Sequence, residues 1–155
     1  MIAYAIEQWN KNKERLKEEL KNDPFVSNCD VTYLYLVKKV VTTILNDEVN
    51  PLLKWDHKAI TEIDNGDYSG TLLYLIPRDL YEPDESDYLI TYVGYGSCSG
   101  CDTLKSIEVM DSEDARLKDY MSLCKDIVCN IKKPYERWND ARFREIEMDA
   151  QEAEK

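Results

Sequence analysis

The chain has 155 residues, 43% of them hydrophobic and 33% charged, and a formal net charge of −11. This length and apolar content predict one globular domain and exclude two domains of ordinary size. No apolar run approaches the roughly 20 residues of a membrane span, and five cysteines do not match a secreted disulfide framework. Because the N-terminal residues lack a basic and apolar signal segment, we expect a cytoplasmic protein.

The negative charge is concentrated in the central third of the chain. Residues 1–61 and residues 115–155 each carry nine acidic and nine basic side chains, whereas residues 62–114 carry thirteen acidic and two basic ones. Phosphate contacts supply most of the affinity for nucleic acids, so direct nucleic-acid binding by this region is disfavoured. Three alternatives remain for this acidic region: it binds a basic protein partner, it imitates DNA, or its charge only keeps the protein soluble.

Two amphipathic segments within residues 1–46 predict a pair of helices. Apolar residues recur at helical spacing from Ile2 to Leu20, and Asn22-Asp23-Pro24 ends the first helix because the residue before proline avoids the α conformation. Asp30 is the expected N-cap of a second helix that continues to about Leu45. The valines and threonines of this segment would also suit a strand, but its length favours a helix.

Residues 59–95 contain three strand candidates, over residues 59–64, 71–76 and 88–95. An Asn-Gly turn signal lies between the first two. The connection between the second and third, residues 77–87, is polar and interrupted by proline, so we expect no regular structure there. Connections this short predict an antiparallel meander.

Residues 102–150 are predicted to form the C-terminal helices. A short helix over residues 102–110 precedes a longer one, which Asp111 or Ser112 caps and Pro134 stops. A last amphipathic segment that includes Tyr135 and Trp138 leads into a frayed acidic tail, residues 151–155. The element order ααβββαα predicts a single α+β domain over residues 1–150, with helices on one face of a small antiparallel sheet.

The most distinctive segment of the sequence, residues 92–102, comes directly after the strand-like run of the third candidate. Dense glycine there predicts backbone with positive φ or close approach, and our main expectation is a tight corner between a strand and a helix. The glycines and the acidic residue of this structural loop are Gly94, Gly96, Gly100 and Asp102. A C-x-x-C pair, Cys98 and Cys101, supplies the candidate residues for catalysis or for a metal.

A structural zinc site would require two ligands beyond Cys98 and Cys101. Cys124 and Cys129 are the natural candidates, but they lie five residues apart in one predicted helix. Five helical steps separate their directions by about 140°, so the two thiols cannot chelate one ion together. We therefore expect no structural zinc and no resident cofactor.

Three other functions of this loop remain as alternatives. A thiol-redox site would use the C-x-x-C pair, although the βαβ unit of thioredoxin-like proteins is missing and acidic surroundings raise a thiol pKa. A nucleophile elbow would require a histidine base, and the one histidine, His57, precedes the first strand. A backbone nest for a nucleotide phosphate is opposed by the local negative charge. The absence of a catalytic constellation favours a role other than catalysis.

The string Tyr95-Gly96-Ser97-Cys98-Ser99-Gly100-Cys101-Asp102-Thr103-Leu104 resembles a signature of small uncharacterised proteins encoded by phages and prophages of Gram-positive bacteria. The resemblance extends over the central part of the chain, from about Ile60 to Leu123, and leaves out the N-terminal helices and the C-terminal tail. It implies the cytoplasm of a bacterial host as the setting. Because it implies no established activity, it assigns no role to any residue.

These observations predict a phage-type accessory protein that binds a host or phage macromolecule without catalysis. We expect a protein partner, no direct binding of nucleic acid and no membrane association, and the sequence leaves the oligomeric state open. A sharper form of the hypothesis is an inhibitor of a nucleic-acid-handling or defence protein. A thiol-redox or metal-binding protein and a nucleotide-binding sponge are the alternatives. The predicted binding residues lie in two acidic loops: Asp64, Asp67, Asp79, Glu82, Asp84, Glu85 and Asp87.

Overall fold

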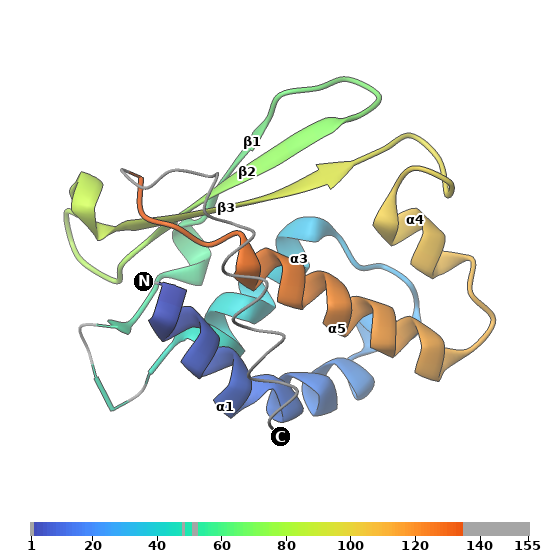
Figure 1. The fold of residues 1–155 in the computed structure, drawn as a ribbon, viewed down its shortest axis with the longest axis horizontal. Coiled ribbons are helices and arrows are strands. Elements are labelled where there is room, and N and C mark those ends of the chain that lie inside the picture. Colours follow the sequence, from blue (N-terminus) through green and yellow to red (C-terminus); the bar gives the residue numbers. More distant parts are fainter. Residues whose placement is uncertain (1, 48, 51–52, 135–155) are drawn as a thin grey trace.

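The computed structural model describes residues 2–47, 49–50 and 53–134, and it confirms the predicted α+β fold. Helices cover one face of a three-stranded antiparallel sheet (Figure 1). The elements before the sheet are α1 (Ile2–Lys21), α2 (Pro24–Ser27), α3 (Tyr33–Lys39), the π-helix η1 (Val40–Leu45) and the 3₁₀-helix η3 (His57–Ala59). The remaining elements are β1 (Thr61–Asp64), β2 (Gly70–Pro77), the 3₁₀-helix η4 (Glu85–Asp87), β3 (Tyr88–Tyr95), α4 (Thr103–Glu108) and α5 (Glu113–Cys129).

The N-terminal helices match the predicted pair in outline and differ from it in detail. The first helix ends as expected, but the single turn of α2 was not predicted from the sequence. The predicted N-cap Asp30 is wrong, because the hydroxyl of Thr32 accepts the amide hydrogen of Tyr35 at 3.1 Å and caps α3. The second helix does reach Leu45, yet its last six residues widen into the π form of η1.

The end of η1 is held by side chains of α1. The last carbonyl groups of a helix have no partner within the helix. Asn12 Nδ2 donates to the carbonyl oxygen of Ile44 at 3.1 Å, and Arg15 Nη2 donates to that of Thr43 at 2.7 Å. These bonds hold the π-helix against α1 and provide hydrogen-bond partners for two carbonyl groups near its end.

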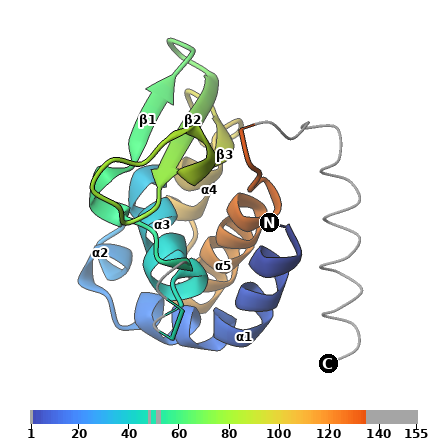
Figure 2. The ribbon, with the colours of Figure 1, turned by 90° about the vertical axis from the view of Figure 1, so that its left-hand side faces the viewer.

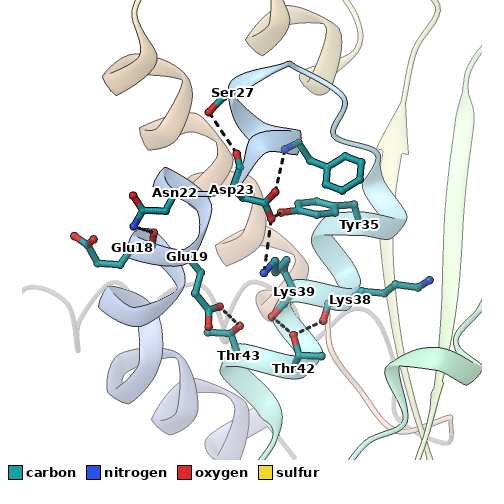
Figure 3. A network of polar contacts seen from close by, with 11 residues as sticks. Glu18, Glu19, Asn22, Asp23, Ser27, Tyr35, Lys38, Lys39, Thr42 and Thr43 are labelled. Atoms are coloured by element: carbon teal, nitrogen blue, oxygen red, sulfur yellow. Dashed lines mark hydrogen bonds and ion pairs between the residues drawn. The ribbon is translucent and has the colours of Figure 1, made fainter.

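A polar network around Asp23 joins α1, α2 and α3 (Figure 3). The Asp23 carboxylate caps α2 by accepting the amide hydrogen of Phe25 at 3.0 Å, and it also accepts the hydroxyl hydrogen of Tyr35. Lys39 Nζ lies 3.8 Å from the same carboxylate. Burial and then this carboxylate raise the pKa of the Tyr35 hydroxyl above its usual value. Asp23 therefore links these three helices, in addition to preceding the proline that ends the first one.

The three strands form the predicted meander, in the spatial order β1-β2-β3. The first strand is shorter than predicted, because residues 57–59 form η3 and β1 begins at Thr61. The register pairs Gly70 with Tyr95 at one end of the sheet and Pro77 with Tyr88 at the other. The loops after β1 and β3 consequently lie at one end, and residues 78–87 lie at the opposite end (Figure 1).

Alternate residues of the two long strands face the helices, as the two-residue period of a strand requires. Thr91 lies on this buried face and donates its hydroxyl hydrogen to the carbonyl oxygen of Ile127 in α5 at 2.7 Å. Beneath the sheet, α1 and α5 pack side by side (Figure 2). The apolar members of the buried face are Leu72, Tyr74, Ile76, Leu89 and Val93.

The last described helix, α5, begins at the predicted cap and ends earlier than predicted. Ser112 accepts the amide hydrogen of Ala115 at 3.3 Å, and the helix ends at Cys129 well before Pro134. After it, residue 132 forms an isolated antiparallel bridge with residue 90 of β3. The last predicted helix and the acidic tail lie outside the described residues. Within the described part, no helix has both the length and the apolar character required to cross a membrane.

Candidate binding groove at one end of the sheet

The structure does not bring the predicted acidic binding residues together, but divides them between the two ends of the sheet. Residues 64–67 lie beside the loop after β3, and residues 79–87 lie at the far end of β2 (Figure 1). The eight residues of β2 separate these loops by about 25 Å. We call the end formed by residues 61–72 and 95–108 the groove end, and the end formed by residues 77–88 the loop end.

At the loop end, two of the predicted binding residues support the loop itself. Asp84 caps η4, and the carboxylate of Asp87 accepts the amide hydrogen of Asp84 at 3.1 Å, so that together they form a capping box. Arg78 donates to the Asp87 carboxylate at 3.2 Å. The expectation that residues 77–87 have no regular structure is therefore wrong, since side chains and backbone amides of this polar segment satisfy one another.

The remaining acidic residues of the loop end face solvent. Lys54 Nζ lies 3.6 Å from the carboxylate of Asp79, and both side chains are at least half exposed. Glu82 and Glu85 are exposed, as is the neighbouring Tyr81, at 98%. This end thus carries charge on an exposed loop.

At the groove end, the hairpin, the glycine–cysteine loop and α4 surround an open groove of about 600 Å³. Residues 31–33, which lead into α3, form its remaining wall. Four exposed carboxylates and three tyrosines line it, against one ammonium group, that of Lys105. The carboxylates belong to Glu62, Asp64, Asp67 and Glu108, and the tyrosines are Tyr33, Tyr68 and Tyr95.

Asp102 ties the groove to the helical layer. Its side chain is 5% exposed and accepts the amide hydrogen of Lys105 at 3.0 Å, which caps α4. Its other carboxylate oxygen accepts the amide hydrogen of Gly96 and the hydroxyl hydrogen of Tyr33, both at 2.9 Å. Burial and the Asp102 carboxylate raise the pKa of Tyr33 to about 12. One buried carboxylate therefore holds the end of β3, the start of α4 and the start of α3.

Gly96 is the glycine of this loop at which a side chain would not fit. A Cβ there would lie 2.5 Å from the carbonyl oxygen of Cys101 and 2.6 Å from its Sγ. At Gly94 and Gly100 the nearest atom to an added Cβ would be 3.9 Å away. No described glycine has a positive φ. The loop therefore requires glycine at Gly96 because Cys101 lies close to it there, and not because its glycines adopt a left-handed conformation.

The rim of the groove is negatively charged and ordered. The carboxylate of Asp64 accepts the hydroxyl hydrogen of Tyr95 at 2.5 Å and the amide hydrogen of Gly66 at 2.9 Å. These bonds lower the pKa of Asp64 and raise that of Tyr95 to about 12, so both keep their usual charge at neutral pH. Lys105 Nζ donates to the carbonyl oxygen of Ser97 at 2.9 Å and so belongs to the wall of the groove.

Cys98 and Cys101 are exposed beside the groove, with their Sγ atoms 3.1 Å apart. The amide of Cys98 donates to the sulfur of Cys101, the two thiols lie within hydrogen-bond distance, and these contacts lower the pKa of the Cys101 thiol. The expectation that acidic surroundings raise the pKa of the loop thiols is therefore wrong for Cys101. Adjacent hydrogen bonds outweigh the more distant carboxylates, which solvent screens.

Cys124 and Cys129 are both buried in α5, away from the exposed pair. Burial raises the pKa of the Cys124 thiol to about 12, so this thiol behaves as a small apolar side chain. In the part of the chain that the structure describes, no group of three or more histidine, cysteine or acidic side chains could hold a metal ion.

Sequence reasoning missed the tyrosines of the groove. Tyr33 is 69 residues before its partner Asp102, so no local pattern links them. Tyr68 lies in the predicted Asn-Gly hairpin and is 84% exposed, a position that could have marked it as a contact residue. A comparison of the chain with protein-family models, curated proteins and solved structures finds no match. The function must accordingly be inferred from the chemistry of the groove.

Proposed function

We propose that this protein is a non-catalytic accessory protein whose groove binds a basic segment of a host or phage protein. The observation that carries the proposal is the set of four carboxylates and three tyrosines around about 600 Å³ of open space. Volumes of this order are typical of ligand sites, at roughly 300–1,000 Å³. The excess of negative charge selects a cationic occupant.

Arginine fits this groove better than lysine. A carboxylate accepts two parallel hydrogen bonds from a guanidinium, and a tyrosine face attracts the same group by about 0.5–1 kcal/mol at an exposed site. The Asp64 carboxylate is already oriented by Tyr95 and Gly66, so binding does not have to order it. The rim charges are exposed, and their attraction is screened over about 8 Å at physiological ionic strength.

Different observations support the proposed phage origin and the proposed class of partner. The sequence of the glycine–cysteine loop supports a phage-encoded origin through its resemblance. A partner that handles nucleic acid, or defends against foreign nucleic acid, presents a basic surface, and occupation of that surface by an acidic groove would inhibit it. Phosphate ligands, including the nucleotides of the sponge alternative, would meet carboxylates at the rim and are disfavoured.

The test is the binding of a fluorescent arginine-rich peptide, measured by anisotropy at increasing salt. We expect affinity that falls as salt rises. The double variant Asp67→Asn/Glu108→Gln removes two exposed rim charges and should weaken binding by about tenfold. The matched control Glu82→Gln/Glu85→Gln removes the same charge from the loop end and should leave the affinity unchanged.

Two results would contradict the proposal. Equal losses in the two double variants would show that net charge alone attracts the peptide. Absence of binding at low salt would exclude a basic occupant altogether. An acidic peptide and a single-stranded oligonucleotide serve as ligands that should not bind.

A further inference from the structure

The exposed cysteine pair beside the groove has a geometry from which a disulfide can form with little movement. The Sγ atoms of Cys98 and Cys101 lie 3.1 Å apart, about 1 Å more than a disulfide bond. A tetrahedral zinc ion with bonds of about 2.3 Å would hold two sulfurs roughly 3.8 Å apart. The observed separation is shorter than a shared metal requires, and the described residues supply no third ligand nearby.

The turn that carries the pair is held in place. The amide hydrogens of Cys101 and Asp102 both donate to the carbonyl oxygen of Cys98, at 3.1 and 2.9 Å. Asp102 is buried and fixed from below, and Gly96 allows Cys101 to pack against the end of β3. The two sulfurs therefore face each other on an anchored loop, while their exposure leaves them open to an external reagent.

The Cys101 sulfur accepts a backbone hydrogen bond within the turn. The amide of Cys98 donates to Cys101 Sγ at 3.3 Å, and this bond and the contact between the two thiols lower the pKa of Cys101. A larger thiolate fraction makes Cys101 the attacking sulfur, since the thiolate is the nucleophile in thiol–disulfide exchange. The Cys98 sulfur, 3.1 Å from that of Cys101, lies in position to react second.

We propose that Cys98 and Cys101 form a redox-active pair that reduces small-molecule disulfides. The Cys101 thiolate attacks one sulfur of the external disulfide, forms a mixed disulfide and releases the other half, which takes up a proton. Cys98 then loses its proton and attacks Cys101 Sγ, which closes the protein disulfide and releases the second half as a thiol. Two protein thiols are oxidised and one disulfide is reduced to two thiols.

The carboxylates of the groove select among such disulfides. The rim residues Asp64 and Asp67 place negative charge near the glycine–cysteine loop, since Gly96 and Ser97 line the same groove. A cationic disulfide such as cystamine is attracted to this site, whereas oxidised glutathione, which is negatively charged at neutral pH, is repelled. The charge selection uses the groove, whereas the dithiol chemistry is independent of what the groove binds.

The experiment treats the reduced full-length protein with cystamine or oxidised glutathione and monitors the intact mass. We expect a loss of the mass of two hydrogen atoms with no lasting adduct, protection of two cysteines from iodoacetamide, and reversal by dithiothreitol. Cys98→Ser should accumulate a stable mixed disulfide at Cys101. Cys101→Ser should react at least about fivefold more slowly. The control Cys29→Ser should behave as the wild type.

Lasting adducts on both cysteines of the wild type, or no oxidation of the pair, would overturn the proposal. Faster oxidation by glutathione disulfide than by cystamine would overturn the charge selection. Both results come from the mass of the wild-type protein, so neither depends on how a variant folds. Because arginine-peptide binding is measured separately, failure of the redox inference and failure of the proposed function are distinguishable.

Discussion

The two ends of the sheet carry similar numbers of acidic residues and use them in different ways. At the loop end, Asp84 and Asp87 bond to the backbone of their own loop, and Asp87 also pairs with Arg78. At the groove end, Asp64 also bonds to its own loop, at the amide of Gly66, but the buried carboxylate of Asp102 holds the neighbouring glycine–cysteine loop, and Asp67 is exposed on the rim. The comparison teaches that acidic side chains support the loops at both ends, and that the groove end adds a buried carboxylate, Asp102, that joins its loop to the helical layer.

An N-cap aspartate contributes differently to stability at the two ends because its surroundings differ. Asp102 and Asp84 are both N-caps that accept backbone amide hydrogens. Asp102 is buried and also accepts the hydroxyl hydrogen of Tyr33, whereas Asp84 is exposed to water. Water replaces a lost hydrogen bond at an exposed site and cannot do so at a buried one.

The largest expected effect comes from removal of these two caps. Asp102→Ala should lower the free energy of unfolding by about 2–4 kcal/mol, because α4 loses its cap and the buried donors of Gly96 and Tyr33 lose their acceptor. Asp84→Ala should cost clearly less. Urea denaturation of both variants measures the difference, and equal losses would contradict the distinction between the two ends.

The second effect isolates the close approach at the groove end. Gly96→Ala would place a Cβ 2.5 Å from backbone atoms of Cys101, so the loop must shift, at about 1–3 kcal/mol. Gly100→Ala adds the same atom where the nearest neighbour is 3.9 Å away, and should leave stability unchanged or raise it by up to about 1 kcal/mol. Denaturation midpoints compare the pair. A loss at Gly100 as large as that at Gly96 would show that the whole loop requires glycine.

The third effect is a loss of stability at alkaline pH. The Tyr33 hydroxyl has a pKa of about 12 in the folded protein, against about 10 in an unfolded chain. Between these values the unfolded state binds fewer protons, so the free energy of unfolding should fall as pH rises from about 10 towards 12. Tyr33→Phe should lower stability at neutral pH and make this alkaline fall shallower.

Tyr81 provides the control for the alkaline experiment. It is 98% exposed at the loop end, so Tyr81→Phe should keep the alkaline slope of the wild type. Thermal melts over the alkaline range give the slopes directly. Identical slopes for Tyr33→Phe and the wild type would exclude a link between the titration of Tyr33 and folding.

Much of the fold was predictable because its signals are local. Strand-like runs between turn signals marked β2 and β3, and a side-chain cap marked the start of α5. The missed features depend on distant contacts: η1 ends against Asn12 and Arg15 of α1, and the chain leaves α5 early to bridge residue 90. Such contacts leave no periodic trace in the sequence.

The candidate site was predictable in composition and only partly in arrangement. The acidic residues were visible as a charge excess, and the meander itself implied that successive loops would lie at opposite ends of the sheet. That consequence separates Asp64 from Asp87, and it was available from the predicted strand order. The contribution of Tyr33 was not available, because 69 residues separate it from Asp102.

The smallest expected effect concerns the ion pairs of the loop end. Lys54 and Asp79 are 60% and 50% exposed, so Lys54→Ala should change the free energy of unfolding by less than about 0.5 kcal/mol, and high salt should abolish the change. Arg78 and Asp87 are 25% and 15% exposed and should contribute more, about 1 kcal/mol on Arg78→Ala. Urea denaturation at low and high salt separates the two pairs. A larger loss of stability for Lys54→Ala than for Arg78→Ala would contradict this ranking, because it would show that the exposed ion pair stabilises the loop end more than the less exposed one does.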